Sequence, residues 1–263
     1  MTTNPVPPDG RAARRAGRSA AALTALALVL PTALGPGSAA AGTALPPPTG
    51  PIAAVPLPSA VEVFSPYLPQ VSCDPVVKPG VKAFAALALA TWGRGHTASL
   101  ARPCGVGGES EHKEGRAWDW GLDLANFTDV VAGARAVSWL LANDALNARR
   151  VGVMYVIWNK RIWSTYRRAE GWRPYTGGDP HTSHIHISFS WAGAMKRTSW
   201  WTGKVAPIEY GPCIAVQGAY APPYGDTINL SPCPPPKAPT SAGTGTVQAT
   251  SVEMPGFTPP PAP

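Results

Sequence analysis

Four of the chain's five histidines fall within two short segments, and an aspartate closes the first of them. The first segment, residues 110–119, reads S-E-H-K-E-G-R-A-W-D and contains His112 and Asp119. The second segment, residues 181–186, reads H-T-S-H-I-H. Histidine and carboxylate ligands from separate segments are typical of sites for borderline metals such as zinc. The two segments therefore predict a zinc site, and their residue types favour hydrolytic chemistry.

The spacing within each segment indicates which side chains can meet. His184 and His186 are two residues apart on an expected strand, so both face the same side. His112 and Asp119 are seven apart and would face opposite sides of an unbroken strand, so we expect Gly115 to permit a turn between them. These candidates exceed the three protein ligands of a catalytic zinc, which leaves its fourth position to a water with a pKa of about 7. The spare histidine can assist that water or stabilise an oxyanion.

Several other residues compete for these roles or could support them. His181, in the loop before the last two histidines, could do the same work as the spare histidine. Asp123 competes with Asp119 as a ligand, although polar anchoring near the next helix explains Asp123 equally well. Ser110 lacks the G-x-S-x-G surroundings of a nucleophile, so we expect it to hydrogen-bond a ligand. His96 has no motif around it and is expected on the surface.

Two helices are expected around these segments. Apolar residues at helical spacing, bracketed by glycines, predict the first over residues 81–92. Thr128 reads as the N-cap of the second, which is expected to run to about Asn147. Residues 93–109 and 172–180 are expected to be loops.

Alternating or β-branched runs predict the strands, with Asn159-Lys160 as a two-residue hairpin connection. Trp118 and Trp120 alternate with Asp119, so we expect them to pack on the opposite face of their strand. The mixed order of helices and strands predicts an α+β fold with a small antiparallel sheet flanked by helices. The expected strands are about 116–122, 151–158, 161–164 and 185–190.

The first segment matches the S-x-H-x-x-G-x-A-x-D signature of the D-alanyl-D-alanine carboxypeptidases and dipeptidases. Their wider group, the LAS fold, also includes lysostaphin-type peptidases and the signalling domain of Sonic hedgehog. The later H-x-H, with another histidine three residues before it, resembles the penicillin-insensitive murein endopeptidases. This resemblance implies that His112, Asp119 and His186 are zinc ligands, and that His184 and His181 are catalytic histidines.

The chain departs from this pattern at one position. The D-alanyl-D-alanine peptidases carry a glutamate general base three residues before the last ligand, and this chain has Ser183 there. The departure favours the histidine-assisted branch over the carboxypeptidase mechanism. Residues 154–159 and 180–189 also resemble an uncharacterised secreted domain family, common in actinobacteria, that is placed beside these peptidases.

The two ends of the chain differ in composition from its middle. Residues 1–41 combine four arginines, an apolar run and a small-residue cleavage pattern, which indicates a signal peptide. A membrane anchor is the alternative, but Pro31 interrupts a run shorter than the ~20 residues that span a bilayer. We expect a Pro-rich linker over 42–70, a zinc peptidase-like domain over 71–233 and a disordered Pro-rich tail over 234–263.

Four cysteines in an exported chain imply two disulfides, with three possible connectivities. We favour nearest-neighbour pairing, which joins Cys73 to Cys104 and Cys213 to Cys233. A Cys-rich zinc site is disfavoured because no cysteine pair has the short spacing of such sites.

The charge balance narrows the choice of partner. The formal net charge of +7 falls to about +4 once residues 1–41 are removed. This mild, scattered basicity suits a polyanionic cell wall and is too weak to indicate nucleic acid. We expect a monomer without a membrane span once the signal peptide is removed, secreted or associated with the cell wall.

The sequence thus favours a secreted zinc peptidase that cleaves peptidoglycan stem peptides or cross-bridges. The alternative is a non-hydrolytic zinc-containing module that binds the wall or a partner. The choice between endopeptidase and carboxypeptidase depends on whether an arginine such as Arg102 or Arg116 reaches a terminal carboxylate.

Overall fold

A six-stranded sheet carries both histidine segments. The computed structural model describes residues 49–214, 220–225 and 227–234, which all belong to one compact unit. Neighbouring strands are antiparallel throughout, in the order β1-β2-β6-β3-β4-β5. The strands are β1 (His96–Ser99), β2 (Ala117–Gly121), β3 (Val153–Trp158), β4 (Arg161–Ser164), β5 (Arg173–Pro174) and β6 (His184–Phe189). With the helices beside it, this sheet confirms the α+β class expected from the sequence.

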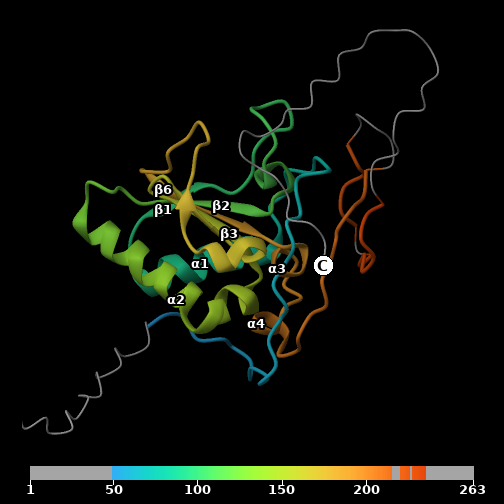
Figure 1. Ribbon diagram of the computed structural model, residues 1–263, viewed down its shortest axis with the longest axis horizontal. Helices are drawn as coiled ribbons and strands as arrows, with labels where there is room; N and C mark the ends of the chain where they lie inside the picture. The colour runs from blue at the N-terminus through green and yellow to red at the C-terminus, as the bar shows by residue number, and fades with distance from the viewer. Residues whose placement is uncertain (1–48, 215–219, 226, 235–263) are drawn as a thin grey trace, which may run out of the picture. The chain divides into compact units, whose positions relative to one another are not determined.

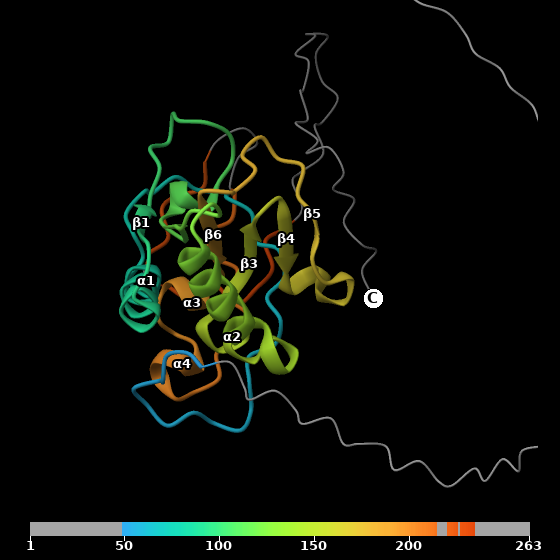
Figure 2. The same cartoon turned by 90° about the vertical axis from the view of Figure 1, so that its left-hand side faces the viewer.

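Helices α1 (Pro79–Trp92) and α2 (Phe127–Val151) lie against one face of the sheet (Figures 1 and 2). The main apolar core forms between them and the strands, and its burial from water is the chief stabilising contribution. Trp118 and Trp120 have no exposed surface, and their rings stack with centroids 5.3 Å apart on this face. Their expected position opposite Asp119 is confirmed. The remaining helices are the short α3 (Trp191–Ala194) and α4 (Ser199–Thr202) and the 3-10 helices η1 (Glu111–Glu114) and η2 (Thr165–Glu170).

The opposite face of the sheet gathers polar side chains from its central strands. In the β2–β6 ladder, Asp119 lies directly opposite His186 and Gly121 lies opposite His184. On the other side of β6, Ile157 of β3 lies opposite His186. Directly paired residues of antiparallel strands project to the same face, so the register itself brings Asp119 beside the histidines of β6.

Helix α2 differs in two ways from the helix predicted over 128–147. Its N-cap is Asn126, whose side chain accepts hydrogen bonds from the backbone N–H groups of Thr128 and Asp129, so Thr128 is not the cap. The helix also continues to Val151 but is interrupted at residues 142–145, where three residues adopt positive φ. Of the predicted apolar stripe, which lies wholly before this interruption, Val137 and Leu140 are buried, whereas Ala134 is exposed. Amphipathic spacing located the helix but did not indicate where its backbone breaks.

Two segments predicted as loops contain short strands. Strand β1 lies within the expected loop 93–109, and the two-residue β5 lies within 172–180. Both are edge strands of the sheet, and β1 is largely exposed. Such strands lack the alternation that a half-buried strand shows, because neither face is regularly covered. The other strand predictions and the hairpin at Asn159-Lys160 are confirmed.

Both predicted disulfides are present. Cys73 is bonded to Cys104, and Cys213 is bonded to Cys233. The first connects the segment before α1 to the loop before η1, with a sequence separation of 31 residues. Paired cysteines of this kind are consistent with an extracellular protein.

Residues 49–70, the described part of the expected linker, contain no helix or strand but run along the domain. The buried carboxylate of Glu62 accepts hydrogen bonds from the backbone N–H and the hydroxyl of Ser199. The part of the chain that packs against the domain therefore begins no later than Glu62. The expected signal peptide and all but the first residue of the expected tail lie outside the described residues. Within the described ranges, no helix combines the length and apolar character needed to cross a membrane.

Candidate metal centre

His112, Asp119 and His186 meet on the polar face of the sheet, although they come from three different elements. His112 Nε2 lies 3.0 Å from Asp119 Oδ1, and His186 Nδ1 lies 2.9 Å from the same oxygen. The three side chains can each offer one ligand atom, and these atoms all lie within 4.8 Å of one another. Tetrahedral ligands at zinc distances are roughly 3.3–3.6 Å apart. The two contacts to Asp119 are a few tenths of an ångström shorter than that spacing, so small shifts separate this cluster from that geometry.

Local backbone structure brings His112 to β2. Ser110 caps helix η1, and its hydroxyl accepts a hydrogen bond from the N–H of His112. Gly115 ends η1 with φ at +63°, and a Cβ there would lie 2.0 Å from the carbonyl oxygen of Val76. Only glycine fits both the conformation and the space, so the turn expected at Gly115 is confirmed. Ser110 supports His112 through the backbone and not through its imidazole.

The imidazole of His112 provides the first test of whether these residues suit a metal. The side chain has no exposed surface, yet neither ring nitrogen has a hydrogen-bond partner among the described residues. Nε2 is close to Asp119 but lacks the alignment of a hydrogen bond. A buried, unpaired imidazole nitrogen is costly, and coordination of a cation would satisfy it.

His186 provides a second, independent test. The Ser188 hydroxyl donates to Glu111 Oε2 at 3.4 Å and lies 2.8 Å from His186 Nε2, so it accepts the Nε2 proton. Tyr155 also donates to this oxygen of Glu111. In that tautomer Nδ1 carries a lone pair toward Asp119 Oδ1. A cation placed between these two atoms would be bound by both lone pairs, so the residues fit a metal.

Replacing Ser188 by alanine tests this assignment of the tautomer. The variant removes the acceptor that holds the Nε2 proton of His186, so we expect metal affinity to fall by roughly 10- to 100-fold. Equilibrium dialysis against buffered zinc measures the change. Ser99→Ala is a matched control, because the Ser99 hydroxyl only donates to the carbonyl of Ala101. Unchanged zinc affinity in Ser188→Ala would contradict the hydrogen-bond chain.

The buried charges of the centre also suit a cation. Burial alone would raise the pKa of Asp119, but the imidazoles of His112 and His186 outweigh it and hold the pKa well below its usual range. Burial lowers the pKa of His112 despite the adjacent carboxylate. Asp119 is therefore ionised and His112 neutral near neutral pH, which are the protonation states of metal ligands.

His184 and His181 lie beside this cluster. The ring of His181 is 4.7 Å from that of His184 and 5.7 Å from that of His186, measured between centroids. Burial, followed by the charge of His186, lowers the pKa of His181 to about 4. The side chain of His184 is 13% exposed, and its Nε2 lies 3.7 Å from Asp119 Oδ1. The structure thus brings together all five residues predicted for the site.

The competing candidates lie elsewhere. Asp123 is exposed and accepts a hydrogen bond from the N–H of Ala125, so it anchors the loop before α2. His96 is exposed on β1, as expected. Arg116 is fully buried and donates to Glu114 and to backbone carbonyl oxygens, so it cannot bind a substrate carboxylate. Arg102 is half-buried, and its backbone N–H donates to the carbonyl oxygen of His112.

Sequence reasoning missed the residues that support the histidines. Glu111 and Tyr155 form the end of the hydrogen-bond chain behind His186, and Asp179 faces His181 and His184. The proximity of Asp179 to His181 in the sequence was a usable signal. No comparable signal marked Tyr155, which reads as one more buried aromatic residue of β3.

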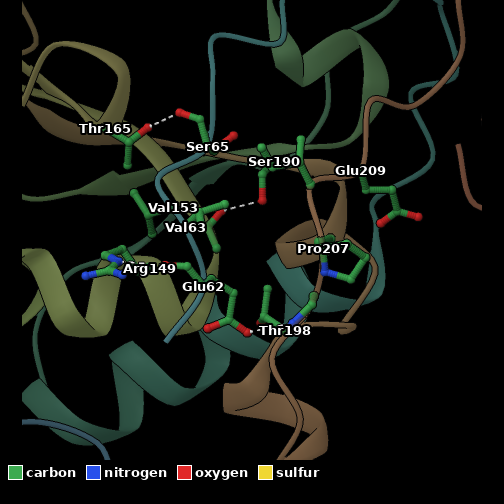
Figure 3. Close-up of a pocket in the computed structure, with 14 residues that line it drawn as sticks. Glu62, Val63, Ser65, Arg149, Val153, Thr165, Ser190, Thr198, Pro207 and Glu209 are labelled. Carbon is green, nitrogen blue, oxygen red and sulfur yellow. Dashed lines mark hydrogen bonds between the residues drawn. The ribbon is translucent and has the colours of Figure 1, made fainter. Parts of the chain in front are cut away.

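Two hollows in the described part of the chain lie away from the histidines. A cavity of about 30 Å³ lies between the N-terminal segment at Glu62 and the segment at Glu209 (Figure 3). It has room for a water-sized molecule and not for a substrate, since ligand pockets are typically ten times larger or more. A wider hollow of about 420 Å³ is lined by α1 and α2 residues and by Arg94. Neither is lined by a histidine.

Residues 73–186 match the family model described as "VldE, C-terminal domain". The matched stretch is less than half of the chain, but it begins at Cys73 and ends at His186, so it contains all five predicted site residues. No curated protein and no solved structure gives a match.

Proposed function

We propose that this protein is a zinc-dependent peptidase that hydrolyses peptide bonds in peptidoglycan stem peptides or cross-bridges. The observation that carries the proposal is the meeting of His112, Asp119 and His186, with His184 and His181 alongside. Closed structural zinc sites use four protein ligands, whereas hydrolytic sites use three and keep one position open. A three-residue donor set with further imidazoles beside it fits the hydrolytic kind.

Each side chain has a distinct task in this proposal. His112, Asp119 and His186 would hold the ion, which when bound supplies the Lewis acidity that polarises a carbonyl and activates water. His184, whose side chain is partly exposed, can contact a substrate and move a proton to the departing amine. His181, whose lowered pKa keeps it neutral, supports it by sharing the proton transfer through the lone pair of Nε2.

The absence of a glutamate at position 183 shapes this mechanism. Ser183 is exposed, and its hydroxyl lies 3.3 Å from His184 Nδ1. A serine hydroxyl is too weak a base to replace a carboxylate, so proton transfer falls to the histidines. Because Arg116 is committed to buried partners, Arg102 remains the candidate for binding a terminal carboxylate, and a carboxypeptidase would require it.

The replacement of His184 by alanine tests the proposal. We expect the zinc held at low free zinc by His112, Asp119 and His186 to stay unchanged while the rate on purified peptidoglycan falls by at least ~100-fold, because a positioned general acid or base is lost. Metal analysis by mass spectrometry and chromatography of released muropeptides measure the two effects. His96→Ala, on the exposed strand β1, should alter neither. A zinc-loaded wild-type protein without activity on any wall preparation would rule out the peptidase.

The second candidate function is a non-hydrolytic zinc-containing module that binds the cell wall or a protein partner. Ser183, in the position where the carboxypeptidases carry a glutamate, is the observation that favours it. In such a module His184→Ala would change neither the zinc held by His112, Asp119 and His186 nor the affinity for the wall. The same variant therefore separates the two functions.

A further inference from the structure

A second group of potential ligands adjoins the first. Asp179, His181 and His184 can each offer one ligand atom, and these atoms lie within 4.8 Å of one another. They come from the loop before β6 and from the first residue of β6. None of the three belongs to the cluster of His112, Asp119 and His186. Two imidazoles and one carboxylate again form a donor set suited to a borderline divalent cation.

The loop holds its two ligands through contacts with its own backbone. His181 has φ at +52°, and its backbone N–H donates to Asp179 Oδ1 at 2.8 Å. His181 Nδ1 lies 2.7 Å from the backbone carbonyl oxygen of Asp179. A carbonyl can only accept, so Nδ1 carries the proton and Nε2 keeps its lone pair for another partner. This is how a backbone carbonyl orients a metal-binding histidine.

His184 stands between the two groups. Its Nε2 lies 3.7 Å from Asp119 Oδ1 and 3.9 Å from Asp179 Oδ2. Both distances are too long for hydrogen bonds. The 3.9 Å distance to Asp179 suits two ligand atoms that face a common ion. The 3.7 Å distance to Asp119 would bring that ion close to the first centre, as in two-metal sites.

We propose that Asp179, His181 and His184 bind a second divalent transition-metal cation, such as Zn²⁺, beside the first centre. This site binds more weakly than the first. The carboxylate of Asp179 is 60% exposed, so it is well solvated and loses water contacts on coordination, whereas Asp119 is only 12% exposed. The first centre fills at low free zinc, and the second fills only as zinc rises.

Occupation of the second site has a consequence that rests on the proposed peptidase function. An ion bound to His181 and His184 takes the lone pairs with which these residues would transfer protons. Excess zinc therefore inhibits the enzyme, and removal of Asp179 relieves the inhibition. The binding of the second ion itself does not depend on any enzymatic activity.

Metal counting on the full chain, prepared without a histidine tag, tests the site. Equilibrium dialysis against buffered Zn²⁺ should give two ions per chain, taken up in two separate steps. Asp179→Asn keeps an oxygen acceptor for the backbone N–H of His181 but removes the negative charge. His181→Asn removes the imidazole and places at position 181, where φ is +52°, a residue that tolerates positive φ. We expect both variants to retain the first step and to weaken the second by at least about tenfold.

Asp123→Asn is the matched control, because Asp123 is an exposed aspartate outside both groups, and it should bind zinc as the wild type does. Saturation of the wild type at one ion, or an unchanged second step in both Asp179→Asn and His181→Asn, would overturn the proposal. Zinc uptake in two steps without any peptidase activity would support the second site and count against the proposed function, so the two failures are distinguishable.

Discussion

Asp119→Asn should abolish tight zinc binding and, with it, any peptidase activity. One oxygen of Asp119 lies within 3.0 Å of nitrogens from both His112 and His186, so this carboxylate is the centre of the cluster. The amide removes the negative charge that offsets a divalent ion in a buried site. Loss of a direct ligand costs more than the roughly 10- to 100-fold typical of a residue that only orients a ligand. Metal content after dialysis and muropeptide release measure the two losses.

The control for this prediction is Asp123→Asn, since Asp123 was the competing ligand in the sequence. The structure places Asp123 in an exposed turn, where an asparagine oxygen can also accept from Ala125. We expect this variant to keep full metal content and activity. Tight zinc binding by Asp119→Asn, or loss of zinc only in Asp123→Asn, would show that the ligand has been wrongly assigned.

The features of the site that could be predicted are those encoded by short-range spacing. Strand alternation places His184 and His186 on one face whatever the rest of the fold does. Asp119 alternates with two buried tryptophans, which orients it toward the opposite face. Gly115 marks the one point where the chain must turn to bring His112 onto that face. A single register between two strands then completes the cluster.

The features that could not be predicted depend on contacts between distant segments. Glu111 meets Tyr155, 44 residues away, only because η1 and β3 border the same face of the sheet. The short edge strand β1 exists because β2 offers it a partner, and its four residues show no pattern of their own. The interruption of α2 was also not predicted: Asn143, Asp144 and Ala145 adopt positive φ within a stretch whose composition suits a continuous helix.

The helix that carries His112 is itself held by a buried ion pair. Glu114, the last residue of η1, and Arg116 have no exposed surface. Glu114 Oε1 accepts from the N–H groups of Val71 and Ser72 and from the Ser72 hydroxyl, and Oε2 accepts from Arg116. Arg116 also donates to the carbonyl oxygens of Phe189 and Leu68. The pair thus joins η1 to the N-terminal segment and to the end of β6.

Glu114→Gln should therefore destabilise the whole domain. Both carboxylate oxygens receive only donors, so the new amide NH₂ must face a donor in either orientation, and Arg116 loses its counter-charge. Breaking a buried pair on one side costs about 3–5 kcal/mol of the free energy of unfolding. Denaturant titration followed by tryptophan fluorescence measures it, and Glu170→Gln, in an exposed pair with Arg167, should leave the midpoint unchanged. Because η1 positions His112, zinc affinity should fall as well. A loss of stability below about 1 kcal/mol would mean that Glu114 and Arg116 are not paired as a buried ion pair.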